Sequence, residues 1–156
     1  MKTLHYSREA FLGVQLVAIL FMAASIIAAG YWSDAANPRR VLMTGCVLAV
    51  AAGFALAPMM GAGSLLLVGA FLSVAMVLMG FVYGPLGAWL PGLFPARVRY
   101  TGASVAFNVG GIIGGGMTPL IAEGLVKAGG LTYVGFYLSG ACALSLVALL
   151  LLKPKT

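Results

Sequence analysis

Five apolar stretches follow one another in this chain, and short links separate them. A bilayer core about 30 Å thick requires about 20 predominantly apolar residues in a helix. We expect helices at about 11–32, 41–60, 64–93, 102–126 and 131–152. The expected fold class is therefore all-α: a polytopic membrane helical bundle of five transmembrane helices, which forms a single membrane domain over residues 1–156.

The composition agrees with a membrane environment and excludes a soluble domain. Hydrophobic residues make up 62% of the chain and charged residues 8%, whereas soluble domains carry about 25% charged residues. The net charge of +6 does not indicate nucleic-acid binding, because the basic residues flank apolar spans and form no polar basic patch. We expect membrane lipid, and not nucleic acid, to surround the protein.

The distribution of lysine and arginine predicts an orientation, since cytoplasmic links carry the excess of these residues. Three lie on the side of the N-terminus and of the second and fourth links, namely Lys2, Arg8 and Lys127. Six lie on the opposite side, namely Arg39, Arg40, Arg97, Arg99, Lys153 and Lys155. The predicted location is a multi-pass protein of the bacterial inner membrane with a cytoplasmic C-terminus.

The sequence offers no nucleophile, metal cluster or phosphate-binding loop. Cys46 and Cys142 lie inside apolar stretches without histidine or cysteine neighbours at ligand spacing, so they are interpreted as small hydrophobic residues. We therefore expect no enzymatic activity, no cofactor, no metal ion and no disulfide between these two cysteines.

Two links carry the most specific local patterns. Residues 30–40 (GYWSDAANPRR) run from Gly30 through Asp34 to Arg39 and Arg40, which predicts a charged clasp around a tight turn. Residues 84–102 contain prolines that interrupt the third span and end on the basic pair Arg97 and Arg99. Because a broken spanning helix requires protein or water to satisfy its backbone, the second pattern favours a helix that lines a path. A kinked packing helix is the alternative.

Together these links resemble the C-terminal half of a major facilitator superfamily transporter. The first is similar to the loop between that family's helices 8 and 9. The second, with LFPARVRYTGAS at 93–104 followed by Asn108, closely resembles the end of helix 10 and the start of helix 11 in the metabolite–proton symporter branch. The resemblance covers almost the whole chain and implies that the five spans correspond to family helices 8 to 12.

The chain departs from the family pattern at several charged positions. Ala35 follows the acid where a base is usual, and Gly92 stands where an acid usually precedes Leu-Phe-Pro. The resemblance implies a cytoplasmic network of Asp34 with Arg97 and Arg99. Because an unpaired acid inside a bundle is costly, we predict that Asp34 keeps a basic partner, with Arg97 as the candidate.

The resemblance implies part of a secondary active transporter that moves small metabolites, organic acids or zwitterions, with protons. Family members contain two six-helix halves, so we expect the chain to be incomplete alone and to require a missing N-terminal half or a second copy. A truncated gene product or a misplaced start would explain the length. The other interpretations are a non-transporting accessory membrane protein and a homodimeric small transporter.

Several polar and small residues inside the spans are candidates for roles in transport or packing. Asn108, Gln15 and Tyr83 are candidates for a substrate path, and the Asn108 amide is expected to face the bundle interior. Glu123 and Lys127 are expected to form an ion pair on one helix face. Close helix packing is expected at glycines with small-xxx-small spacing, namely Gly110, Gly111, Gly114 and Gly115.

Overall fold

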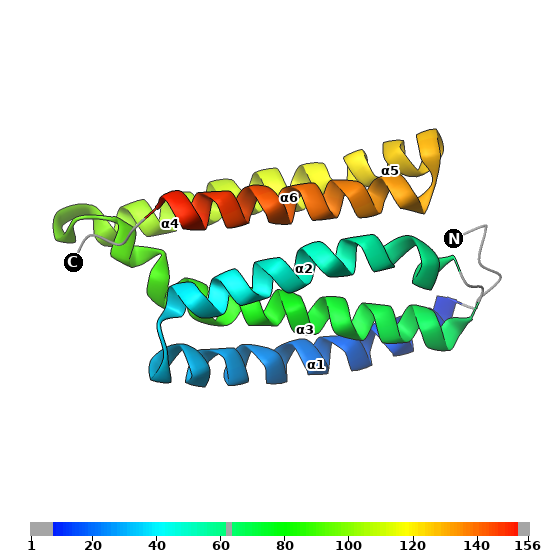
Figure 1. Ribbon diagram of the computed structural model, residues 1–156, viewed down its shortest axis with the longest axis horizontal. Coiled ribbons are helices and arrows are strands. Elements are labelled where there is room, and N and C mark those ends of the chain that lie inside the picture. Colours follow the sequence, from blue (N-terminus) through cyan, green and yellow to red (C-terminus); the bar gives the residue numbers. More distant parts are fainter. Residues whose placement is uncertain (1–7, 62–63, 153–156) are drawn as a thin grey trace.

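Helices make up the fold throughout the described part of the chain. A computed structural model describes residues 8–61 and 64–152 (Figure 1). The elements are α1 (Arg8–Ala35), α2 (Pro38–Met60), α3 (Leu65–Trp89), two short 3-10 turns (Pro91–Leu93 and Ala96–Val98), α4 (Arg99–Gly111), a π-helical segment η3 (Ile112–Met117), α5 (Thr118–Gly129) and α6 (Leu131–Leu151). Five helical spans are long and apolar enough to cross a membrane, which confirms the expected fold class.

The spans differ from their predicted bounds mainly at the arginine-bearing end. The first continues beyond residue 32 to Ala35, because the N–H of Ala36 still donates to the Trp32 carbonyl at 2.8 Å. The second begins at Pro38 instead of residue 41, since Asn37 caps it by accepting a hydrogen bond from the Arg39 N–H. The third ends at Trp89 and not at residue 93, because Pro91 has no N–H and the chain tightens into a 3-10 turn.

Two helix pairs form the packed part of the molecule. α1 packs along α3, and α2 lies between α3 and α6, as Figure 1 shows. α4, η3 and α5 follow one another as a single span, Ala96–Gly129, which lies beside α6 and which we call the fourth span. The packed part therefore consists of α1, α2, α3 and α6.

Small residues bring α1 and α3 together. A Cβ atom added at Gly80 would lie 2.6 Å from the Met22 carbonyl oxygen, and one at Gly84 would lie 2.8 Å from that of Ile26. The Ser25 hydroxyl donates to the Val77 carbonyl at 2.6 Å across the same contact. Small residues allow such close backbone approach in membranes, where helix association relies on packing and hydrogen bonds.

The pair α2 and α6 is antiparallel and is also built on close backbone contact. A Cβ atom on Gly53 would lie 3.0 Å from the Gly135 carbonyl oxygen. The Ser139 hydroxyl donates to the Val50 carbonyl at 2.9 Å. We call this contact the α2·α6 seam.

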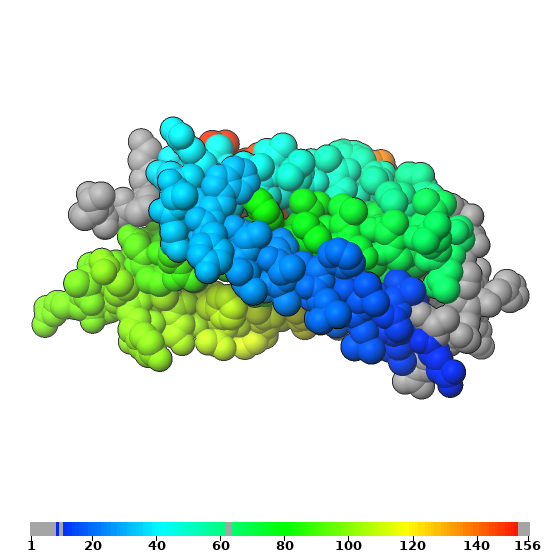
Figure 2. Space-filling view, turned by 90° about the horizontal axis from the view of Figure 1, so that it is seen from below, coloured from blue at the N-terminus to red at the C-terminus, as the bar shows by residue number. Residues whose placement is uncertain are grey.

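The fourth span is packed in a different way. It runs from 96 to 129, longer than the expected 102–126, and no residue from 90 to 134 is buried. Figure 2 shows this span along one edge of the molecule, beyond α1. Its π-helical segment comes just before Pro119, and a widened turn there relieves the clash between the proline ring and the preceding helical turn.

A tight turn returns the chain from the fourth span to α6. Gly130 has a φ of 74°, the only positive φ recorded in residues 8–61 and 64–152. The Gly130 N–H donates to the Val126 carbonyl at 3.0 Å and closes α5. Glycine adopts a positive φ without the steric cost of a side chain.

Candidate functional site

The charged residues singled out in the two links lie at one end of the bundle. α1 and α3 end there, α2 and α4 begin there, and α6 ends there (Figure 1). The residues at this end, which we call the arginine end, are Asp34, Arg39, Arg40, Arg97 and Arg99. Four arginines and one acid give this end a strongly positive charge.

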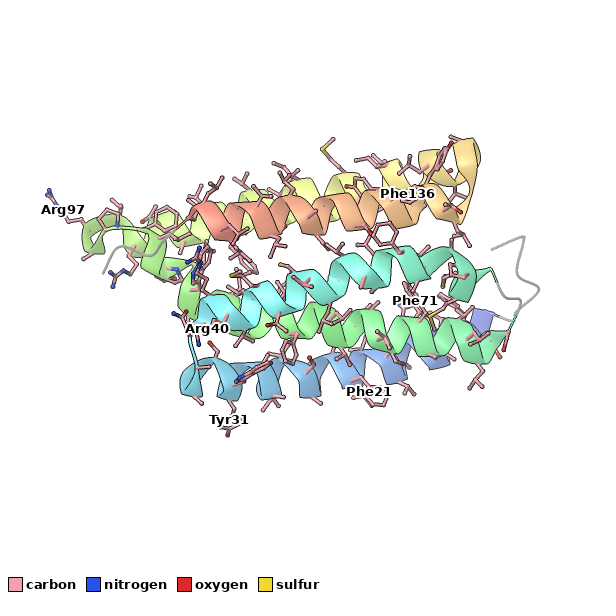
Figure 3. The ribbon with its side chains drawn as sticks, viewed as in Figure 1. Phe21, Tyr31, Arg40, Phe71, Arg97 and Phe136 are labelled. Carbon is pink, nitrogen blue, oxygen red and sulfur yellow. The ribbon has the colours of Figure 1, made fainter. Side chains whose placement is uncertain are left out.

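Asp34 does not form the predicted ion pair. It is exposed, and no ion pair connects it to Arg97 or to another arginine of the described residues, among which Lys127–Glu123 is the ion pair recorded. Arg97 points away from the bundle in Figure 3. The prediction rested on a buried acid, and an exposed carboxylate is stabilised by solvent and needs no such partner.

Arg39 instead connects α2 to the end of α6. Its Nε donates to the Leu149 carbonyl and its terminal nitrogen to the Leu150 carbonyl, both at 2.9 Å. The last carbonyls of a helix have no partner within the helix, and a cation there also interacts favourably with the helix dipole. Arg40 is exposed (Figure 3), so the two neighbouring arginines have different roles.

The segment that carries the strongest family resemblance folds into a compact turn. The Phe94 ring covers Gly102, where an added Cβ atom would lie 2.5 Å from the ring. Arg99 Nε donates to the Phe94 carbonyl at 3.4 Å, and the Val98 N–H donates to the Pro95 carbonyl at 3.0 Å. Glycine at position 102 therefore allows the aromatic ring to close the turn against α4.

The structure brings two of the three substrate-path candidates near each other. The Tyr83 ring packs edge-on against Phe107, with 6.2 Å between ring centroids, and Asn108 follows in sequence. Both Tyr83 and Asn108 are exposed. The third candidate, Gln15, lies elsewhere: α1 and α3 are parallel and Val14 contacts Gly69, which places Gln15 about 20 Å from the level of Tyr83 at a rise of about 1.5 Å per residue.

The Asn108 side chain was expected to face the bundle interior, but in this chain it does not. Its amide nitrogen donates to the Ser104 carbonyl at 2.8 Å and approaches the Ser104 hydroxyl at 3.5 Å, one turn earlier in α4. The amide thus satisfies its donor on its own helix, which removes the need for an interior partner.

The predicted glycine packing face has no partner helix within the described part of this chain. Cβ atoms added in the fourth span would meet no atom within 4 Å at Gly110, Gly111, Gly114 and Gly115. The close-packed glycines are those of α2, α3 and α6. Gly30 does belong to a close contact, since a Cβ atom on Gly84 would lie 3.1 Å from its nitrogen.

Near the opposite end of the bundle, Lys127 and Glu123 form the expected ion pair at 2.7 Å along α5. Both side chains are largely exposed, so the pair contributes little to stability. Within residues 8–61 and 64–152 no group of three metal-ligating side chains is found. The arrangement offers polar and cationic surface for binding.

Comparison with known proteins finds similar transporters. The chain is 41% identical over 146 residues to the inner membrane metabolite transport protein YhjE of Escherichia coli (strain K12), a match that covers 92% of this chain and 33% of that protein. It is 30% identical over 151 residues to the shikimate transporter of the same organism, covering 95% of this chain and 34% of that protein. The citrate-proton symporter of Klebsiella pneumoniae is 35% identical over 125 residues, a match that covers 76% of this chain and 27% of that protein. No family model and no solved structure matches.

The inner membrane relative and the five apolar helices both indicate that the chain lies in a membrane. The chain spans about a third of the length of the curated relatives it matches. It is a segment of a multi-pass integral membrane protein of the transporter type. The chain is therefore similar to about one third of the length of these transporters, and this similarity agrees with a fragment of a major facilitator transporter of the metabolite–proton symporter type.

Proposed function

We propose that this chain forms the C-terminal part of a secondary active transporter that moves small organic acids or zwitterions across the inner membrane together with protons. The observation that carries the proposal is 41% identity over 92% of the chain to an inner membrane metabolite transport protein. Relatives named for shikimate, for ectoine and proline, and for citrate with protons support the substrate class.

The uncovered fourth span supports the proposal that the chain works with a further membrane segment. No residue of Ala96–Gly129 is buried, and large apolar side chains such as Ile112 and Leu120 are more than 70% exposed. Alternating access requires a second body against which this one moves. We assign the fourth span to that contact, with the missing N-terminal portion as its partner.

Tyr83 and Asn108 are the side chains that we place on the substrate path. They come from α3 and α4, and the Tyr83 ring packs against Phe107, the residue that precedes Asn108 in the chain. An aromatic hydroxyl and an amide are groups that hydrogen-bond carboxylates and hydroxyls of small metabolites. Their exposure in this chain supports a position on the surface that we assign to contact with the missing portion.

Orientation follows from the arginine end, which we place in the cytoplasm. Arg39, Arg40, Arg97 and Arg99 lie together there, as the positive-inside rule requires for cytoplasmic links. A green fluorescent protein fused after Thr156 should fluoresce, and alkaline phosphatase at the same site should be inactive. The reverse pair of results would contradict the orientation.

The transport proposal is tested by assembly. The chain is produced with the complementary two thirds of YhjE, the assembled proteins are reconstituted in liposomes, and uptake of labelled shikimate, citrate and proline is measured with an imposed proton gradient. We expect uptake by the pair, none by the chain alone, and strongly reduced uptake in Asn108→Ala but not in the matched exposed variant Ser145→Ala.

Two outcomes would contradict the proposal. Uptake by the chain alone, with the chain eluting as a dimer, would favour the homodimeric transporter. A folded chain that binds the complementary portion without any proton-dependent uptake would favour an accessory role.

A further inference from the structure

The α2·α6 seam brings the two cysteines of the chain to the same level. On α2 the seam contains Arg39, Leu42, Cys46, Ala49 and Gly53, and on α6 it contains Gly135, Ser139, Cys142, Leu146 and Leu149. The spacing alternates between three and four residues on both helices. This pattern keeps one face of each helix turned toward the other.

Contacts at both ends of the seam determine its register. At one end Arg39 Nε donates to the Leu149 carbonyl at 2.9 Å. At the other, a Cβ atom on Gly53 would lie 3.0 Å from the Gly135 carbonyl oxygen. The two contacts are 14 residues apart on each helix, so the register of the two helices is the same at both ends of the seam. Cys46 and Cys142 lie halfway between the contacts, seven residues from each.

Burial agrees with this register. Cys46 is 4% exposed and belongs to a core cluster with Leu42 and Leu149, against which Leu146 packs. Cys142 is partly exposed at the rim of the seam, and both thiols are free. One sulfur thus lies inside the seam and the other is reachable from the surrounding lipid.

The neighbouring residues permit the close approach that a disulfide requires. Bonded cysteines have Cα atoms about 4.4–6.8 Å apart. Ala49, Ser139, Gly53 and Gly135 occupy the next two levels of the seam, and small residues there let the backbones approach closely. The Ser139 hydroxyl bond to Val50 at 2.9 Å shows this closeness one level away from the cysteines.

We propose that Cys46 and Cys142 form an oxidisable thiol pair, at which a lipid-soluble two-electron oxidant joins α2 to α6 by an intrachain disulfide. With molecular iodine, the Cys142 sulfur attacks iodine and releases iodide and a proton. The Cys46 sulfur then attacks the Cys142 sulfur, displaces the second iodide and loses its proton. Two thiols and one iodine molecule thus give one disulfide, two iodides and two protons.

The experiment treats membranes that contain the full chain with iodine, blocks remaining thiols with N-ethylmaleimide, and measures intact mass and proteolytic peptides. We expect most chains to lose two hydrogen atoms, to resist alkylation, and to yield a linked peptide pair that reduction separates. Free thiols on both cysteines after treatment, or a disulfide between two copies, would overturn the proposal.

Two variants distinguish facing cysteines from general reactivity. The double variant C142A/A143C keeps two thiols but moves one by about 100° around α6, to an exposed position, and should form no intrachain disulfide. In a chain with C46A/C142A, the pair A49C/S139C occupies the next level and should be linked. Linkage of this second pair without linkage of the native pair would show that the native sulfurs are out of reach, and would overturn the proposal.

Discussion

The α2·α6 seam and the fourth span are both apolar and rich in small residues, but only the seam is packed. In the seam, a Cβ atom on Gly53 would lie 3.0 Å from the backbone of α6. In the fourth span, a Cβ atom on Gly114 would meet no atom within 4 Å. The same residue type therefore marks a contact in one region and open surface in the other.

This difference teaches that a partner helix, and not glycine content, determines where a membrane helix is buried. Lipid tails are as apolar as leucine, so apolar surface alone does not bring helices together. The seam has complementary small residues, a hydroxyl bond and a bidentate arginine. Four pairs of substitutions test this difference. Each pair compares a residue in a packed contact with a residue of the same type outside the packed contacts.

The largest effect is expected from truncating a core leucine. Leu42 is 1% exposed in the core cluster, whereas Leu120 of the fourth span is 73% exposed. Leu42→Ala should lower the free energy of unfolding by about 2–5 kcal/mol, the usual cost of an unfilled cavity, and Leu120→Ala should change it little. Unfolding of the detergent-solubilised chain by sodium dodecyl sulfate, followed by circular dichroism, gives both values. Equal losses would show that the fourth span is packed in solution.

A smaller effect is expected from adding one methyl group to a seam glycine. In Gly53→Ala the new Cβ atom meets the α6 backbone, so the free energy of unfolding should fall by about 1–3 kcal/mol through overpacking. In Gly114→Ala the space is open, and the higher helix propensity of alanine should raise stability by up to about 1 kcal/mol. The same titration measures both variants. A stabilised Gly53→Ala protein would refute the close approach at the seam.

The neighbouring arginines provide the third pair. Arg39→Ala removes two hydrogen bonds to the last carbonyls of α6 and should cost about 1.5–2 kcal/mol, at the lower end of the range for bonds to charged groups because the bond to Leu150 is exposed. Arg40→Ala removes an exposed side chain and should cost less than about 0.5 kcal/mol. Hydrogen exchange should rise at residues 146–151 in the first variant only. Unchanged exchange there would show that Arg39 does not hold the end of α6.

The sequence predicts the spans well, because bilayer thickness limits their length and proline limits their ends. Five spans are expected, and residues 8–61 and 64–152 contain five. The prediction missed the end of α3, since Pro91 ends the α-helix at Trp89 although the apolar residues continue. Hydropathy locates apolar residues, whereas backbone hydrogen bonding decides where the helix stops.

Residue partners were harder to predict than spans. The acid at 34 and the basic pair 39–40 indicated a charged clasp, but Arg39 bonds to backbone carbonyls more than 100 residues away. The residue letters do not show which backbone carbonyls at a helix end will lie near an arginine, so this hydrogen-bond acceptor could not be predicted from the sequence. The three-and-four spacing of small residues around Cys46 and Cys142 indicates a packed face on each helix, but a sequence does not specify which helix packs against that face.

The smallest effect is expected from a single hydroxyl. Ser139 donates across the seam to Val50 at 2.9 Å, whereas Ser145, on the same helix, donates to Ala141 of its own helix at 3.1 Å. Hydrogen bonds between membrane helices contribute about 0.6 kcal/mol on average, so Ser139→Ala should lose about that much and Ser145→Ala less. Combining Ser139→Ala with Gly53→Ala gives a sharper measurement, because removing the hydroxyl leaves room for the new methyl group. The double variant should therefore be less destabilised than the two single variants added together, and strict additivity would show that the two residues do not share one contact.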